Sequence, residues 1–328
     1  MNRLVKRLIL ALLLGVAVYA AFVLYTGLDR IAGSLGRYRW STFALALALA
    51  TGNYLLRFGK WQYYLARLGV KGVRPLDSLL VFLSGFVLTI TPGKVGEVFK
   101  SAVLARTHGV PATQTAPIVI ADRLTDVIAI VILIVLGSTT FDGGMGWAIA
   151  GSSAVALGLV AIAWQAPTRA LLAFIATRGG LLGRIAPRLV DAYASLRVLA
   201  APAALLWPTL LSLVAWSGEA IALYVIVGGF GESLPFGRSF FFYCTATLAG
   251  ALIPVPGGLG VVEGMIREQL VHLSQIPEGA ATGSMMLVRF ATLWWSVVLG
   301  FVALGLLRLR FPRELGGDAA LASVTRAE

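Results

Sequence analysis

Charged and polar side chains beside a proline-glycine step are the residues of this sequence best suited to bind a ligand. The step reads Thr91-Pro92-Gly93-Lys94, and Glu97 follows almost one helical turn later. Proline and glycine end helices, and proline is also favoured in the first turn of the next one, so two half-helices are expected to meet here. The second half-helix begins with unpaired N–H groups and a partial positive charge, and Lys94 adds a full charge. We interpret this break as an anion-binding site.

The same kind of break occurs a second time in the chain. Pro256, Gly257 and Gly258 again follow an apolar run, residues 240–252, and the two breaks lie 164 residues apart. Matched interruptions of apolar segments in two halves of a chain indicate the binding site of a transporter. Two unrelated helix–loop–helix corners are the alternative interpretation.

Charged and polar residues flank the two breaks at similar distances. Arg123 and Arg289 follow their breaks by 31 and 33 residues, while Asn53 and Glu219 precede them by 39 and 37. We therefore expect Arg123 and Arg289 to face one cavity from opposite sides. There, their planar guanidinium groups are suited to bidentate binding of a phosphate group.

The composition excludes an ordinary soluble domain. Of the 328 residues, 58% are hydrophobic and 13% are charged, and the mean hydropathy is +0.86. These values predict an all-α membrane protein with several spans. The net charge of +12 lies in short loops between apolar segments, where it indicates membrane orientation, so nucleic-acid binding is not expected.

Cofactor and metal chemistry have no support in the sequence. The single cysteine, Cys244, lies in an apolar run and has no partner for a disulfide, and His108 and His272 are isolated. No spacing typical of a metal site is present. We therefore expect neither a metal nor a cofactor.

The apolar segments predict six full spans, and the two breaks predict re-entrant helical hairpins that do not cross the membrane. The expected spans are residues 8–25, 40–64, 116–137, 147–164, 203–230 and 285–307, and the broken segments are 88–100 and 240–273. A basic N-terminus before an apolar run is shared by signal peptides and first membrane helices. The length of the run favours an uncleaved signal-anchor helix.

These segments divide the chain into a transmembrane domain, residues 1–310, and a disordered cytoplasmic tail, residues 311–328. Within the domain we expect a first repeat, an amphipathic cytoplasmic connector and a second repeat. Their boundaries are about 40–166, 167–202 and 203–308.

Loop charges predict that both termini are cytoplasmic. Loops 57–77 and 166–202 are rich in arginine and lysine, whereas 138–146 and 275–284 have neither. The basic outside loop at 30–39 is the exception. With this topology the two repeats run in opposite directions, which predicts an inverted repeat with a binding site at the membrane midplane.

Several charged residues lie inside the expected spans. Asp122, Arg123 and Asp126 share one span, Glu219 lies in another, and Glu263 lies on the second half of the broken segment 240–273. An ionisable residue at the centre of a membrane helix costs about 2.5 to 3.5 kcal/mol on insertion scales, which makes each of them a functional candidate. Internal ion pairs that lock the helices together are the alternative.

Asn53, Arg57 and Lys60 share one face of the helix expected at 40–64. For Arg57 and Lys60 the alternative is snorkelling, in which the side chain reaches along the helix to the membrane boundary. We therefore rank this group second to the residues at the breaks.

Together these motifs resemble the transmembrane, flippase-like region of lysylphosphatidylglycerol synthases, which also occurs as stand-alone membrane proteins. The resemblance covers most of residues 1–310, and one motif departs from the family: its usual Glu-Arg-x-x-Asp has the shorter Asp at position 122. The resemblance rests on Asn53 with Arg57, on residues 91–97, on Asp122-Arg123 with Asp126, and on residues 254–260 with Glu263.

The resemblance implies lipid translocation. In the synthases, aminoacyl transfer to phosphatidylglycerol belongs to a soluble C-terminal domain, and no such domain is expected in this sequence. The resemblance therefore does not carry over lipid synthesis.

The leading hypothesis is a lipid flippase that moves an anionic, phosphate-bearing lipid between leaflets of the bacterial cytoplasmic membrane. Lys94, Arg123 and Arg289 receive the phosphate, and the buried carboxylates balance them when the site is empty. A proton- or ion-coupled carrier of a small anion is the first alternative. A membrane transferase with paired carboxylates as acid and base is the second, but no loop is long enough for a donor-binding domain, so we expect no enzyme. A homo-oligomer is compatible with the sequence.

Overall fold

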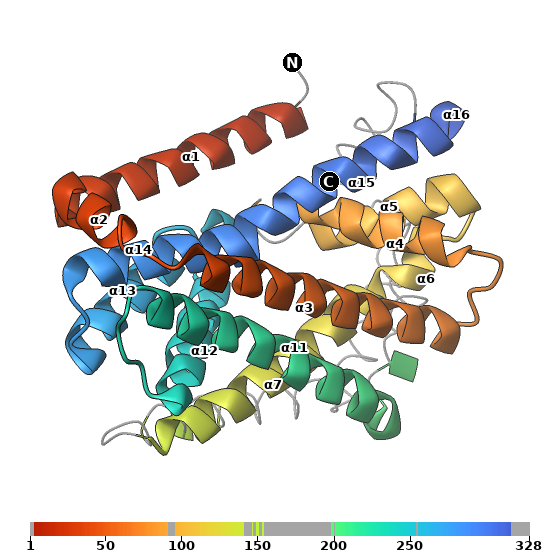
Figure 1. Cartoon of the computed structure of the whole chain (residues 1–328). Coiled ribbons are helices and arrows are strands. Elements are labelled where there is room, and N and C mark those ends of the chain that lie inside the picture. The colour runs from red at the N-terminus through yellow and green to blue at the C-terminus, as the bar shows by residue number, and fades with distance from the viewer. Residues whose placement is uncertain are drawn as a thin grey trace, which may run out of the picture.

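The computed structural model describes residues 3–90, 96–140, 201–253 and 255–315, with short pieces at 146, 149–150, 153 and 198–199 (Figure 1). Every element bounded in these ranges is a helix, which confirms the predicted all-α character of the fold. In chain order the elements are α1 (Arg3–Thr26), α2 (Leu28–Leu35), α3 (Trp40–Arg67), α4 (Pro75–Ser84), η1 (Gly85–Leu88), α5 (Gly96–His108), α6 (Ala112–Thr115), α7 (Pro117–Ser138), α11 (Pro202–Gly229), α12 (Phe236–Leu252), η3 (Pro256–Gly258), α13 (Val261–Ser274), α14 (Glu278–Arg289), η4 (Phe290–Trp294), α15 (Trp295–Arg310) and α16 (Pro312–Leu315). η1 and η3 are 3₁₀ turns, and η4 is a π-helical turn.

Proline sets the start of several helices around the site. Pro75, Pro117 and Pro202 lie in the first turns of α4, α7 and α11. The missing N–H of proline has no helical partner there in any case, and its fixed φ suits a helix. α12 and α14 instead begin directly after Pro235 and Pro277.

The long helices α3 and α11 lie side by side and form the centre of the molecule (Figure 1). α7 packs against α11 and α12, while α15 packs against α4 and η1. At the other end of the molecule, α2 packs against α14. The helices of both halves of the sequence thus share one bundle.

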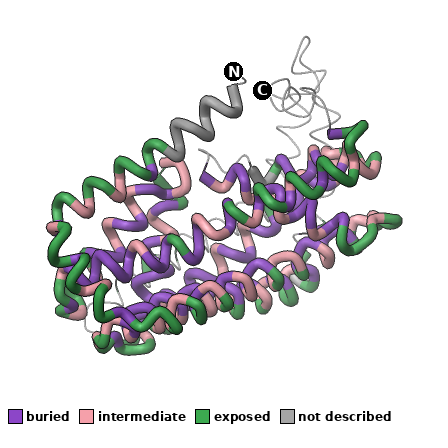
Figure 2. Tube along the Cα trace, turned by 45° about the horizontal axis from the view of Figure 1, so that its top comes forward, coloured by how far each residue is buried: buried purple, intermediate pink, exposed green. Residues whose placement is uncertain are grey.

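Two apolar cores fill the bundle, and Figure 2 shows the buried interior that they form. The first core joins the N-terminal half of α3 to α11, α12, α13 and α14. The second core joins the C-terminal half of α3 to α4, α5 and the end of α15. α3 and α7 contribute to both cores, so the polar residues in the middle of these helices lie between the cores.

Two helices in the described ranges are long and apolar enough to cross a membrane, Ala203–Gly229 and Glu278–Arg310. A third candidate is the pair Leu13–Thr26 and Leu28–Leu35, which is bent by 94°. α3 and α7 contain 28 and 22 residues, but charged side chains interrupt both. The expected count of six spans therefore stays a prediction.

The first helix is attached to the folded domain. Between α1 and α2 the chain bends at Gly27, whose φ of 93° favours glycine. From α1, the Tyr19 hydroxyl lies 3.5 Å from Glu263 Oε1 and accepts a hydrogen bond from Trp294 Nε1 at 3.0 Å. The expectation that this helix is not cleaved stays a prediction.

The last long helix begins at Glu278, seven residues before the predicted start at Met285. The added residues are mainly small and polar and therefore lack the apolar signal of a span. Pro277 starts the helix, and Gly279 lies directly against the backbone of Arg30 in α2. Packing against α2 thus sets the start of this helix, which hydropathy alone does not predict.

The predicted tail also begins too early. α16 continues the chain after α15, and Leu315 is only 4% exposed because it packs in the second core. A single apolar residue in a polar segment gives no pattern that sequence reasoning could use. The expected span at 147–164 and the connector at 167–202 lie almost wholly outside the described residues.

Candidate functional site

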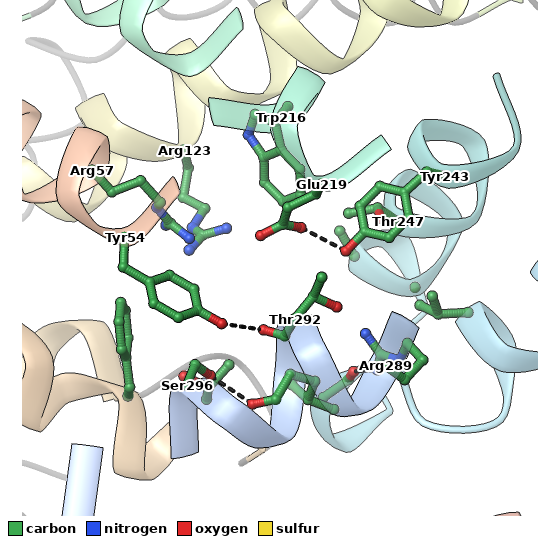
Figure 3. Close-up of a pocket in the computed structure, with 18 residues that line it drawn as sticks. Tyr54, Arg57, Arg123, Trp216, Glu219, Tyr243, Thr247, Arg289, Thr292 and Ser296 are labelled. Atoms are coloured by element: carbon green, nitrogen blue, oxygen red, sulfur yellow. Dashed lines mark hydrogen bonds between the residues drawn. The ribbon is translucent and has the colours of Figure 1, made fainter. Parts of the chain in front are cut away.

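A cavity of about 120 Å³ with charged side chains in its wall lies between the two cores, where α3, α7, α11, α12 and the last long helix meet (Figure 3). A water molecule needs about 10 to 15 Å³ of such space, so a phosphate-sized group fits. Arg57, Arg123, Arg289 and Glu219 are the charged side chains of the described residues that line it. Arg123 and Arg289 thus line the same cavity, and their role as a phosphate clamp stays a prediction.

Lys60 is the centre of a buried ionic cluster beside the cavity. Its Nζ lies 2.6 Å from Asp122 Oδ1 and 2.8 Å from Asp126 Oδ1, and it donates a hydrogen bond to Ser212 Oγ at 2.7 Å. Ser212 in turn donates to Asp126 Oδ1 at 3.0 Å. The lysine side chain is fully buried, so these contacts on α7 and α11 replace its water.

Arg57 and Arg123 lie between this cluster and the cavity. Arg57 Nη2 lies 3.2 Å from Asp122 Oδ2 and 3.4 Å from Asp126 Oδ2, whereas Arg123 Nη1 lies 3.9 Å from Asp126 Oδ2. Figure 3 shows the two guanidinium groups close together at the cavity wall. Among the described residues of α3 and α7, three cations therefore share two carboxylates, and the excess charge is positive.

A further cation, Lys100 on α5, is buried beside the second core. Its Nζ lies 4.9 Å from the ring centre of Trp61 and 5.2 Å from that of Phe82. Aromatic faces attract cations, which partly replaces the water that the ammonium group loses on burial. Lys100 thus adds positive charge close to the first break.

Glu219 on α11 is held by neutral donors. Asn53 Nδ2 donates to Glu219 Oε1 at 2.5 Å, and the Tyr243 hydroxyl donates to Glu219 Oε2 at 2.5 Å. Asn53 comes from α3 and Tyr243 from α12, so the carboxylate joins three helices across the cavity wall (Figure 3).

Arg289 on α14 is tied to the second break. Its Nε donates to Glu263 Oε1 at 2.6 Å, and its Nη2 donates to the Gly257 carbonyl at 2.9 Å. Glu263 Oε2 also accepts from the backbone N–H of Gly260 at 2.8 Å, at the start of α13. One buried ion pair therefore fixes the break, the next half-helix and the cavity arginine together.

The second break has the backbone that its glycines predict. Gly257 has a φ of 61°, a region in which a side chain is strained. A Cβ added there would lie 3.4 Å from Cα of Ile90, the last described residue before the first break. Ile90 and Leu259 also share a small apolar cluster. The chain before the first break therefore touches the second break.

Most of the predicted site residues lie at the cavity or in the clusters beside it. These are Asn53, Arg57, Asp122, Arg123, Asp126, Glu219, Gly257, Gly258, Glu263 and Arg289, and Pro256 begins the turn that carries the two glycines. Thr91, Pro92, Gly93 and Lys94 lie outside the described residues, as does the side chain of Glu97. The anion site expected at the first break stays a prediction.

Sequence reasoning gave Lys60 too small a role. The snorkelling alternative is wrong for this residue, because its side chain is fully buried between two aspartates. The signal was its helical spacing from Asn53 and Arg57, which places all three on one face. Tyr54, Trp216 and Tyr243 also line the cavity. Isolated aromatic residues in apolar segments carry no signal that distinguishes them from core residues.

In the part of the chain that the structure describes, no group of three or more histidine, cysteine, aspartate or glutamate side chains is arranged to hold a metal ion. The cavity instead offers guanidinium groups, hydroxyl groups and one carboxylate. These groups can bind and release an anion without making or breaking a covalent bond.

An apolar helical bundle with charged residues buried around a cavity defines an integral membrane protein. Its family follows from a comparison with known protein families, in which residues 10–300 match the lysylphosphatidylglycerol synthase TM region. The chain belongs to this family, as its motifs predict, and so to a lipid-related group of membrane proteins. A search of curated proteins found no match.

Proposed function

We propose that this protein moves a phosphate-bearing anionic lipid between the leaflets of a membrane. The observation that carries the proposal is the convergence of three arginines, Arg57, Arg123 and Arg289, on one cavity from three different helices. Arginine binds phosphate oxygens through parallel N–H groups, and a site between helices lets several arginines share one phosphate.

The charge balance around the cavity supports an anionic ligand. The described cations at the cavity and in its neighbouring clusters outnumber the described carboxylates by five to four. The cations are Arg57, Lys60, Lys100, Arg123 and Arg289, and the carboxylates are Asp122, Asp126, Glu219 and Glu263.

The rim of the cavity favours a lipid over a small soluble anion. Ala251, near the end of α12, lines the cavity and is also exposed on the outside of the bundle. The next two residues, Leu252 and Ile253, are 76% and 47% exposed. A lipid can place its head group inside at this point and leave its acyl chains against this apolar rim. A small anion has no acyl chains that could contact such a rim.

The topology belongs to the same proposal. We infer six full spans, cytoplasmic termini and an inverted repeat of residues 40–166 and 203–308 in a bacterial cytoplasmic membrane. Ile90 lies against Gly257, which supports two hairpins whose breaks approach each other.

The test is leaflet exchange by the full-length protein in liposomes. Lipids with a fluorescent acyl chain are incorporated, and a membrane-impermeant reductant destroys the label in the outer leaflet. We expect faster loss of the inner label for phosphatidylglycerol and a polyprenyl phosphate than for a neutral glycolipid with the same chains. Equal rates for all head groups, or rates equal to protein-free liposomes, would contradict the proposal.

The carrier of a small anion is tested in the same liposomes. Uptake of labelled inorganic phosphate without lipid exchange would favour that function. The transferase interpretation gains nothing from the geometry of the described residues, because Asp122 and Asp126 are both held by Lys60 and no pair of free carboxylates faces the cavity.

A further inference from the structure

Glu219 differs from the other described carboxylates around the cavity. Asp122 and Asp126 lie within 2.8 Å of Lys60 Nζ, and Glu263 lies 2.6 Å from Arg289. Glu219 has no lysine, arginine or histidine within ion-pair distance among the residues that the structure describes, and its two oxygens accept hydrogen bonds from an amide and a phenol. It also lines the cavity.

The surroundings of Glu219 are charged but more distant. Arg57 and Arg289 attract a negative charge on Glu219, and Asp126 repels it. The charged or titratable groups that face it from the helices packed around α11 are Tyr54 and Arg57 on α3, Asp122, Arg123 and Asp126 on α7, Tyr243 and Cys244 on α12, and Arg289 on α14. Its nearest partners are therefore hydrogen-bond donors and not cations.

A phosphate group in the cavity and an ionised Glu219 would repel each other, because about 120 Å³ leaves them only a few ångströms apart. A proton removes this repulsion. Protonation of Asp122, Asp126 or Glu263 would break an ion pair with a lysine or arginine, whereas protonation of Glu219 breaks none. Of the four described carboxylates around the cavity, Glu219 can therefore gain a proton without the loss of an ion pair.

We propose that Glu219 takes up one proton when the phosphate head group enters the cavity and releases it when the head group leaves. An O–H bond forms on one Glu219 oxygen with a proton from water on the side of entry, and the proton returns to water on the side of exit. While protonated, the carboxyl group donates a hydrogen bond to a phosphate oxygen or to the Tyr243 hydroxyl. This inference rests on the proposed lipid transport, and it makes that transport proton-coupled.

The test uses full-length protein in liposomes that contain fluorescent phosphatidylglycerol and a trapped pH-sensitive dye. For the wild type, a pH gradient should speed exchange several-fold in the direction of proton flow, and the dye should report proton movement together with lipid. Glu219→Gln should lose both the gradient dependence and the dye signal, whatever rate of lipid exchange it retains. Glu314→Gln, at an exposed position outside the cavity, should behave as the wild type.

The outcomes separate this inference from the proposed function. Wild-type exchange that ignores the gradient, or a Glu219→Gln protein that keeps the gradient dependence, overturns proton coupling and leaves lipid transport in place. No exchange of any lipid by the wild type overturns both.

A second variant keeps the inference testable if Glu219→Gln does not fold. Tyr243→Phe keeps the ring and removes one donor that stabilises the ionised carboxylate. Protonation of Glu219 then becomes easier, so the midpoint of the pH dependence of exchange should move to higher pH. An unchanged midpoint in a folded Tyr243→Phe protein overturns the inference.

Discussion

The two arginines in matching sequence positions, Arg123 and Arg289, are held in different ways. Arg289 lies 2.6 Å from Glu263, and its side chain is 8% exposed, whereas Arg123 lies 3.9 Å from Asp126, and its side chain is 29% exposed. On α7 the aspartates lie closer to Lys60 than to Arg123. On α7 a buried lysine is thus the closest partner of the acids, and the arginine that lines the cavity contacts them at a longer distance. In the second half of the sequence, Arg289 both pairs with the buried acid and lines the cavity.

The largest effect should come from removing the cation that holds the first cluster. Lys60→Met leaves Asp122 and Asp126 without their closest partner, and loss of one member of a buried ion pair costs about 3 to 5 kcal/mol. The measurement is the melting temperature of the protein in detergent. Lys71→Met, at an exposed position, is the matched control and should melt with the wild type. Equal melting of both variants would show that Lys60 is not the centre of the cluster.

The second cluster should respond to the loss of its single acid. Glu263→Gln weakens the hydrogen bonds to Arg289 and to the Gly260 N–H, and bonds of this kind to charged groups are worth about 1.5 to 3 kcal/mol. Glu278→Gln is the control: the side chain of Glu278 is 43% exposed, pairs with Arg30 at the surface, where a pair is worth about 1 kcal/mol or less, and lies 3.9 Å from Arg267. Denaturant unfolding in detergent compares the two. A larger loss of unfolding free energy for Glu278→Gln than for Glu263→Gln would contradict this prediction.

Exchange of arginine for lysine separates binding from folding at the two sites. Arg123→Lys should keep the wild-type melting temperature and slow lipid exchange, about tenfold for each 1.4 kcal/mol of lost phosphate binding. Arg289→Lys should slow exchange and also lower the melting temperature, because one ammonium group cannot reproduce the bonds to both Glu263 and Gly257. Arg67→Lys, at the exposed end of α3, is the control. Wild-type exchange in both cavity variants would exclude a phosphate clamp.

The smallest effect concerns the contact between the two breaks. Gly257→Ala places a side chain at a φ of 61°, which costs about 1 to 2 kcal/mol, and sets its Cβ 3.4 Å from Ile90 Cα, at the near limit of ordinary van der Waals contact. Gly69→Ala has the same strain at a φ of 69° but meets no atom within 4 Å. The melting temperature should therefore fall further for Gly257→Ala. Equal losses would mean that the contact with Ile90 contributes nothing to stability.

Much of this fold could be predicted because its signals are local. Pro256 with Gly257 and Gly258 breaks a helix whatever surrounds it, and the runs that became α7 and α11 are long and apolar. The matching offsets of Arg123 and Arg289 also predicted that they share a cavity.

Partners across the bundle could not be predicted in the same way. The burial of Lys60 depends on Asp126 and Ser212, which lie 66 and 152 residues away in the sequence. A lysine near a basic loop looks the same whether it reaches water or two aspartates. The sequence also cannot predict that Glu219 lacks a described cation within ion-pair distance, because this depends on how the helices place their side chains.

The last long helix holds one residue more than a regular α-helix of the same length would hold. Its π-helical turn η4 begins directly after Arg289, and Tyr54 donates a hydrogen bond to the Thr292 carbonyl within it at 2.8 Å. One residue corresponds to about 100° of rotation about the helix axis, so α14 is turned by about that angle relative to α15. With α15 packed as it is, an uninterrupted helix would point Arg289 about a quarter of a turn away from Glu263 and Gly257. The π-helical turn thus sets the direction in which the Arg289 side chain leaves the helix toward the cavity.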